Sequence, residues 1–194
     1  MLNDKMMEKV EFATKAVAYY RAHRIQEGEK IIEFFDELKE YIRDVVSLWV
    51  GETNIGVPKT APVEQVFQSF YTELMALLLM LKNNTNSLTD AEKTFTEALL
   101  YRGKVYRYLG RKDIKIRKPI MPMYNSVYVS WSKRKELTSY AKSKYRGVKT
   151  LLSAEILEDY GIDLDYFDLV QQKTENEVVY PTNKKAILSI EFVD

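Results

Sequence analysis

The sequence has 194 residues, of which 46% are hydrophobic, with no cysteine and a single histidine, His23. These counts exclude disulfides, thiolate nucleophiles and Cys-ligated zinc, and they argue against a His-based catalytic triad or a multi-His metal site. The net charge of +1 conceals a segregation, because residues 100–149 contain 15 Lys or Arg and 2 Asp or Glu. We expect this segment to attract phosphates, although it could instead pack beside the acidic segments and remain solvated.

The first half of the chain, residues 1–99, has the periodicity of amphipathic helices. The strongest apolar stripe covers residues 31–49, and glycines and prolines interrupt the pattern over residues 51–62. Thr89 and Glu92 have the spacing of a capping box and predict the start of one more helix. Apolar stripes with this spacing usually form a core, so we assign them a packing role.

From residue 101 the pattern changes to the alternation that is typical of strands. Strands are predicted over residues 101–108, 126–132, 148–156, 161–164, 178–180 and 186–193. The last two are expected to pair across a turn around residues 181–183. A basic connection with two prolines covers residues 113–122, and a helix is predicted over residues 133–145. Helices followed by strands predict an α+β protein.

The longest apolar run, Leu74 to Leu81, is too short to span a bilayer. The first residues lack the apolar core of a signal peptide. We therefore expect a soluble protein located in the cytoplasm, and delivery by a leaderless route stays open.

The first motif with chemical potential is Tyr101-Arg102-Gly103. An arginine on a strand offers a planar, permanently charged fork that suits a pyrophosphate, and a neighbouring glycine lets a ligand approach the backbone closely. The alternative is an ordinary exposed arginine at the edge of a sheet.

The second motif lies on the strand predicted over residues 126–132. Tyr128, Ser130 and Ser132 share one face, whereas Val129 and Trp131 share the other. One aromatic ring and two hydroxyls can stack on a flat ligand and orient a carboxylate. The alternative is an ordinary polar strand face.

The third motif is Glu175-Asn176-Glu177, which leads into a β-branched strand. In extended chain the two glutamates project from the same face, and no basic residue lies between them. Crowded like charges raise the pKa of one partner, which suits acid–base or cation-stabilising chemistry. The alternative is a surface strand with two solvated carboxylates.

In this order the three motifs resemble those of the mono-ADP-ribosyltransferase family, and more narrowly its Arg-Ser-Glu class, over roughly residues 90–194. The chain length and the helical first half look most like the small bacteriophage-encoded members, which would place the protein in a host cytoplasm. The resemblance implies an α+β fold with a split pair of small antiparallel sheets and an N-terminal helical region. We expect residues 1–89 to form that region and residues 90–194 the NAD-binding catalytic core, together in one compact unit.

The resemblance also implies roles for the residues that bind NAD. Arg102 would hold phosphate and ribose oxygens, beside Tyr101, and the backbone of Gly103 would pair with the nicotinamide amide. Tyr128 and Ser132 would line the same site.

For catalysis, the resemblance implies that Glu177 acts on the ribose, that Ser130 orients Glu177, and that Glu175 receives an acceptor arginine. NAD would be the substrate, no metal is implied, and the partner would be a protein with an accessible arginine. NAD hydrolysis, a nucleic-acid acceptor and an inactive binding or inhibitor module remain alternatives. One departure is plain, because Trp131 stands where the family has a threonine.

Overall fold

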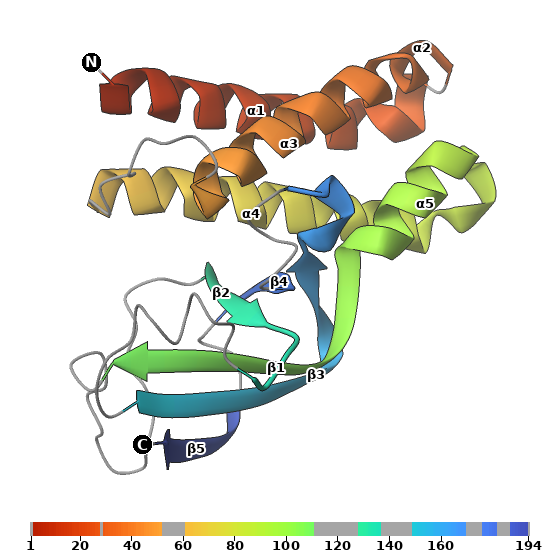
Figure 1. Cartoon of the computed structure of the whole chain (residues 1–194). Helices are drawn as coiled ribbons and strands as arrows, with labels where there is room; N and C mark the ends of the chain where they lie inside the picture. Colours follow the sequence, from red (N-terminus) through yellow and green to blue (C-terminus); the bar gives the residue numbers. More distant parts are fainter. Residues whose placement is uncertain are drawn as a thin grey trace. The chain divides into compact units, whose positions relative to one another are not determined.

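The computed structural model describes residues 2–27, 29–51, 61–110, 128–136, 149–169, 176–181 and 187–193. Two compact units make up the chain: residues 1–99 with 166–171, and residues 100–165 with 172–194. The first unit is helical and the second is built on an antiparallel sheet, which confirms the predicted α+β class (Figure 1). The expected split pair of small sheets in the ADP-ribosyltransferase arrangement stays a prediction.

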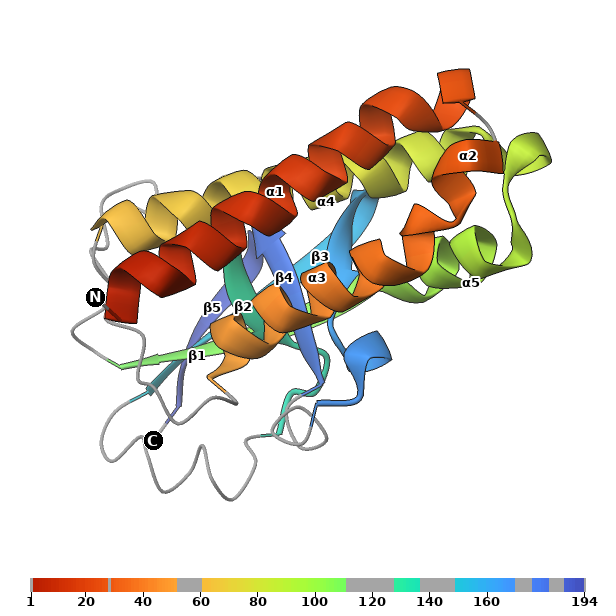
Figure 2. The ribbon, with the colours of Figure 1, turned by 90° about the horizontal axis from the view of Figure 1, so that it is seen from above.

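The first unit consists of helices with apolar faces that meet in one core. The helices are α1 (Leu2–Glu27), α2 (Glu29–Ile32), α3 (Phe34–Val50), α4 (Ala61–Asn83) and α5 (Asp90–Leu99). α1 packs along α4, as Figure 2 shows, and also against α3. The largest fully buried side chains of this core are Tyr20, Leu38, Ile42, Phe70, Tyr71, Leu74, Leu77, Leu78, Leu81, Phe95 and Leu99. The predicted stripes are therefore packing surfaces.

The helix ends follow from local chemistry. Gly51 ends α3 in the left-handed conformation, with φ of 77°, and its N–H donates to Ser47 O at 3.1 Å. At the start of α5, Thr89 N–H donates to Glu92 Oε2 at 2.7 Å, and Glu92 N–H donates to Thr89 Oγ1 at 3.2 Å. This reciprocal pair is the predicted capping box.

Glu92 is also the centre of a buried polar network inside the helical unit. Its carboxylate is 0% exposed and accepts hydrogen bonds from Tyr20 Oη at 2.7 Å and from Arg24 Nε at 2.5 Å and Nη2 at 2.9 Å. Burial raises the pKa of Glu92, but these bonds and those from Thr89 outweigh it and lower the pKa to about 2. The network ties α1 to the start of α5.

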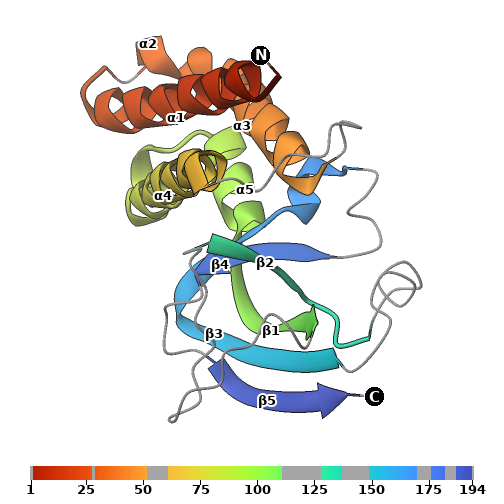
Figure 3. The same ribbon diagram turned by 90° about the vertical axis from the view of Figure 1, so that its left-hand side faces the viewer.

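The sheet of the second unit contains β1 (Leu100–Gly110), β2 (Tyr128–Ser132), β3 (Lys149–Asp163), β4 (Glu177–Pro181) and β5 (Ile187–Val193). The order is β1-β2-β4-β3-β5, and β1 also pairs with β3. β1, β2, β4 and β3 therefore pair in a closed circuit, and β5 lies along β3 outside it (Figure 3).

One face of these strands is apolar and fully packed. The buried cluster contains Val105, Val129, Trp131, Leu152, Ala154, Ile156, Val178 and Tyr180, and the ring of Tyr101 packs against it. Because side chains alternate along a strand, the residues between these members project from the opposite face. That alternation separates the polar candidates on β2 and β4 from the core.

Three expectations about the second half of the chain need correction, two about strands and one about a helix. β4 and β5 do not pair, because β4 has β2 on one side and β3 on the other, whereas β5 pairs with β3. The strands predicted over residues 148–156 and 161–164 are one strand, β3, with an irregularity opposite Arg102. No helix begins at Lys133: residues 133–136 bend instead, and Lys133 N–H extends the β2–β4 pairing by donating to Asn176 O at 2.9 Å.

The remainder of that predicted helix and the basic connection of residues 113–122 lie outside the described residues. Among the helices that the structure does describe, none combines the length and the apolar character that a membrane crossing requires.

Candidate active site

The candidate site is built on the β2–β4 ladder. Its register places Ser132 opposite Glu177 and Ser130 opposite Val179, in an antiparallel pairing. Ser130, Ser132 and Glu177 therefore project from the same face, and their neighbours along each strand project into the apolar core. The ladder supplies a rigid base for these polar groups.

The structure brings Ser130 and Glu177 into direct contact, with Ser130 Oγ donating a hydrogen bond to Glu177 Oε1. Glu177 is only 7% exposed, which is unusual for a carboxylate. A buried carboxylate needs hydrogen bonds, and the serine hydroxyl supplies one while also fixing the direction of the carboxyl plane. The two residues come from motifs 47 positions apart, so local sequence does not impose their meeting.

The third member of that strand face, Ser132, lies directly opposite Glu177 in the ladder. Its hydroxyl accepts a hydrogen bond from Arg134 N–H at 3.0 Å and so shapes the bend after β2. Tyr128 is at the other end of β2, opposite Pro181, and is 8% exposed.

Trp131 projects away from the hydroxyl face into the core. It is 2% exposed, and its Nε1–H donates to Tyr180 O at 3.3 Å across the β2–β4 ladder. Tryptophan in place of the expected threonine thus adds a packing group to the core face of the sheet, opposite to the face that carries Ser130.

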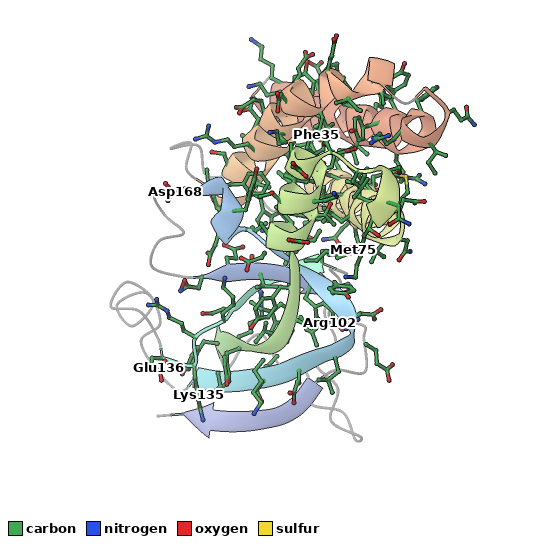
Figure 4. The ribbon with its side chains drawn as sticks, turned by 90° about the vertical axis from the view of Figure 1, so that its right-hand side faces the viewer. Phe35, Met75, Arg102, Lys135, Glu136 and Asp168 are labelled. Carbon is green, nitrogen blue, oxygen red and sulfur yellow. The ribbon has the colours of Figure 1, made fainter. Side chains whose placement is uncertain are left out.

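Arg102 is not brought to Glu177. Its Nε donates to Asp159 O at 3.3 Å and its Nη2 to Glu158 O at 3.2 Å, and its guanidinium carbon lies 4.1 Å from the ring centroid of Tyr160. These partners belong to the irregular part of β3, beside which Figure 4 labels Arg102. In this structure Arg102 satisfies carbonyls where the β1–β3 ladder is interrupted.

Gly103 and Tyr101 form a tight corner next to Arg102. Gly103 has φ of 136°, and a Cβ placed there would lie 2.9 Å from Tyr101 Oη, so only glycine fits without movement. Tyr101 Oη donates to Lys104 O at 3.0 Å, and burial raises the pKa of this phenol. Steric fit therefore favours glycine at position 103, independently of its predicted NAD-binding role.

Glu175 lies outside the described residues. Of the motif Glu175-Asn176-Glu177, the structure therefore describes Asn176 and Glu177. Asn176 has φ of 48°, in the left-handed region that asparagine tolerates better than most residues. With its amide turned to face Arg134, its side-chain oxygen accepts from Arg134 Nε at 2.7 Å. The segment thus turns sharply just before Glu177.

Sequence reasoning missed two basic residues that bond to the strands carrying Ser130 and Glu177 or next to them, Arg107 and Lys133. Arg107 Nη1 donates to Ser130 O. Lys133 Nζ donates to Asp163 Oδ2 at 2.8 Å and to Asp165 Oδ2 at 2.5 Å. Lys133 belongs to a basic run that resembled the start of a helix, and no sequence pattern links it to carboxylates some thirty residues away.

The described residues contain no group of three or more acidic, cysteine or histidine side chains that could hold a metal ion. The His23 ring stacks on the exposed ring of Tyr19, with centroids 4.1 Å apart. A carboxylate held by a hydroxyl can accept a hydrogen bond from a sugar hydroxyl and can stabilise a nearby cation. Comparison of the chain with protein-family models, with curated proteins and with solved structures found no match.

Proposed function

We propose that the chain is a mono-ADP-ribosyltransferase of the Arg-Ser-Glu class, which transfers ADP-ribose from NAD to an arginine of a protein and releases nicotinamide. The observation that carries the proposal is the hydrogen bond from Ser130 Oγ to Glu177 Oε1. The class is expected to use a strand serine to orient its catalytic glutamate, and this contact joins two of the three motifs on which the resemblance rests.

In the proposed reaction, the bond between the nicotinamide nitrogen and ribose C1′ breaks, and its electron pair leaves with nicotinamide. The ribose becomes oxocarbenium-like, as in glycoside cleavage. Glu177 accepts a hydrogen bond from a ribose hydroxyl and stabilises the developing positive charge. A guanidinium nitrogen of the acceptor then bonds to C1′, and its proton passes to Glu175 as general base.

Arg102 has to leave its present partners to take up a phosphate. Its two hydrogen bonds, at 3.2 and 3.3 Å, are at the long end of the normal range. The side chain is exposed, so exchange of two carbonyls for a phosphate requires no unpacking of the core. A bidentate phosphate contact is the stronger of the two arrangements. Gly103, Tyr101, Tyr128 and Ser132 keep their proposed places around NAD.

The competing proposal from another class is a binding or inhibitor module without catalysis. The engagement of Arg102 with Glu158 O, Asp159 O and the ring of Tyr160 favours it, because a structural arginine would not hold NAD. NAD hydrolysis and a nucleic-acid acceptor are variants of the first proposal that differ only in what attacks C1′. The basic segment of residues 100–149 is the reason to retain the nucleic-acid variant.

The test is transfer of label from NAD carrying a labelled adenylate, in lysates of several bacteria, with nicotinamide release measured in parallel. We expect Glu177→Gln to reduce both by about 10²–10³-fold, as for loss of a group that stabilises a transition state. Ser130→Ala should reduce both by a smaller factor, because Glu177 remains but loses its orientation. Glu175→Gln should abolish transfer and keep some hydrolysis.

Glu136→Gln is the matched control, because Glu136 is an exposed glutamate after β2, labelled in Figure 4, with no predicted role. It should behave as the wild type. Absence of both label transfer and nicotinamide release in the wild type would refute the enzyme and favour the binding module. Label that ribonuclease removes would identify a nucleic-acid acceptor.

A further inference from the structure

The start of β4, which carries Glu177, is held by two backbone hydrogen bonds outside its own ladder. Lys133 N–H donates to Asn176 O at 2.9 Å, and Leu164 N–H donates to Glu177 O at 3.0 Å. The two acceptors are successive carbonyls, so together they fix the peptide plane that precedes the Glu177 side chain and the one that follows it. Asn176, with φ of 48° in the left-handed region, is the residue at which the chain turns into β4, and the first of these bonds is made to its carbonyl.

Both donors depend on the same lysine. Lys133 supplies the first N–H itself, and its Nζ bridges Asp163 and Asp165, the residues on either side of Leu164. Nζ lies 3.1 and 2.8 Å from the two oxygens of Asp163 and 2.5 Å from Asp165 Oδ2. An ammonium has three donors, and these carboxylate oxygens account for all three.

The bridge is partly shielded from water, which makes it stronger than a surface ion pair. The side chains of Lys133, Asp163 and Asp165 are 22%, 15% and 34% exposed. The ring of Tyr101 covers Nζ at 5.7 Å from its centroid. Burial lowers the pKa of Lys133, but the two carboxylates outweigh it and leave the pKa above its ordinary value. Lys133 therefore stays charged and bridging at neutral pH.

We propose that Lys133 is a positioning residue, whose bridge to Asp163 and Asp165 holds Leu164 against Glu177 O and so sets where the Glu177 carboxylate lies. Lys133 touches neither the carboxylate nor, in the proposed reaction, the substrate. Its role in catalysis rests on the proposed function, whereas the bridge itself does not.

Small displacements of a catalytic group have large effects, since a misplacement of about 1 Å costs about 10²-fold in rate. Removal of the Lys133 charge should therefore lower kcat for nicotinamide release by about 10- to 100-fold. KM for NAD should stay within about twofold, because the proposed NAD contacts of Arg102 and Gly103 are untouched and methionine keeps an apolar side chain beside the Tyr101 ring that covers Lys133 Nζ. Lys133→Arg keeps the charge and should restore most of kcat.

The experiment compares Lys133→Met, Lys133→Arg and the control Lys104→Met, which removes an exposed lysine from the same unit. Hydrogen exchange at the Leu164 amide, followed by NMR, reports on the bridge whether or not the protein turns over NAD. We expect exchange at Leu164 to be at least about tenfold faster in Lys133→Met, with the Val105 amide of the β1–β3 ladder unchanged as evidence of intact folding.

Unchanged exchange at Leu164 in Lys133→Met would overturn the bridge. Faster exchange with an unchanged kcat, or a rise in KM with kcat preserved, would overturn the positioning role. If the wild type releases no nicotinamide, the proposed function and the catalytic half of this inference both fail, while the exchange result still decides whether Lys133 holds Leu164 in place.

Discussion

Replacement of Glu92 by glutamine tests the buried network of the helical unit. The substitution keeps the size of the side chain and removes its charge, which leaves the Arg24 guanidinium, 7% exposed, without a counter-ion. Loss of one partner of a buried ion pair typically costs about 3–5 kcal/mol. The pKa gives a consistent figure, because a fall from 4.5 to about 2 in the folded protein corresponds to about 3 kcal/mol of stability at neutral pH.

The sign of the pH dependence follows from the lowered pKa. A carboxylate whose pKa is depressed by folding contributes its stability above the unfolded value, and that contribution is lost as pH falls through the folded value. For Glu92 the window is pH 4.5 down to about 2. The difference between wild type and Glu92→Gln should therefore be constant from pH 7 to 5 and shrink as pH falls toward 2.

Urea unfolding followed by circular dichroism at the helical band measures both effects. The matched control is Glu73→Gln, because Glu73 pairs with Arg21 at 3.0 Å but the side chains of Glu73 and Arg21 are 30% and 39% exposed. That pair should contribute about 0.2–1 kcal/mol. The reasoning is refuted if Glu92→Gln costs no more than Glu73→Gln, or if the difference from wild type persists at pH 2.

Two further substitutions test the sheet unit by the same unfolding assay. A Cβ at Gly161 would lie 2.5 Å from Val178 Cγ1, so Gly161→Ala should lower the free energy of unfolding by about 1–3 kcal/mol. Adding Val178→Ala to that variant should recover part of this loss, and full additivity of the two costs would contradict the contact. Trp131→Thr, which installs the threonine that the resemblance leads one to expect, should cost about 3–5 kcal/mol because it empties a buried site. A cost near zero would mean that Trp131 does not support the sheet.

The sequence was most informative where a periodic pattern and a local rule agreed. The helical stripes and the Thr89–Glu92 capping box have a physical basis within a few residues, and the structure confirms them. The same holds for alternation on β2, which predicted that Ser130 and Trp131 project from opposite faces.

Strand partners could not be predicted in the same way. Proximity in sequence favoured a hairpin of β4 with β5, but both edges of β4 are occupied by β2 and β3. Pairing is decided by which edges remain free in the assembled sheet, and that information is not local.

At the candidate site, too, the sequence predicted some contacts and not others. Motif order led to Ser130 and Glu177, which the structure places in contact. It did not indicate that Arg102 would satisfy carbonyls of an irregular strand, or that Lys133 would bridge two distant aspartates. The Arg102 contacts depend on where a strand irregularity exposes backbone carbonyls, which leaves little trace in composition. The Lys133 bridge depends on which distant segments the fold brings together.

The seam between β1 and β2 has a consequence for motion. Among the described residues, these strands share one register pair, Tyr106 with Ser132, whereas β2 and β4 share five. A ring of strands parts first at its thinnest join, so slow breathing of the sheet would open this seam and leave β2 attached to β4. Ser130 and Glu177 lie on β2 and β4, which stay paired on the same side of that opening. The two residues would therefore move together, and opening of the seam would not break the hydrogen bond between them.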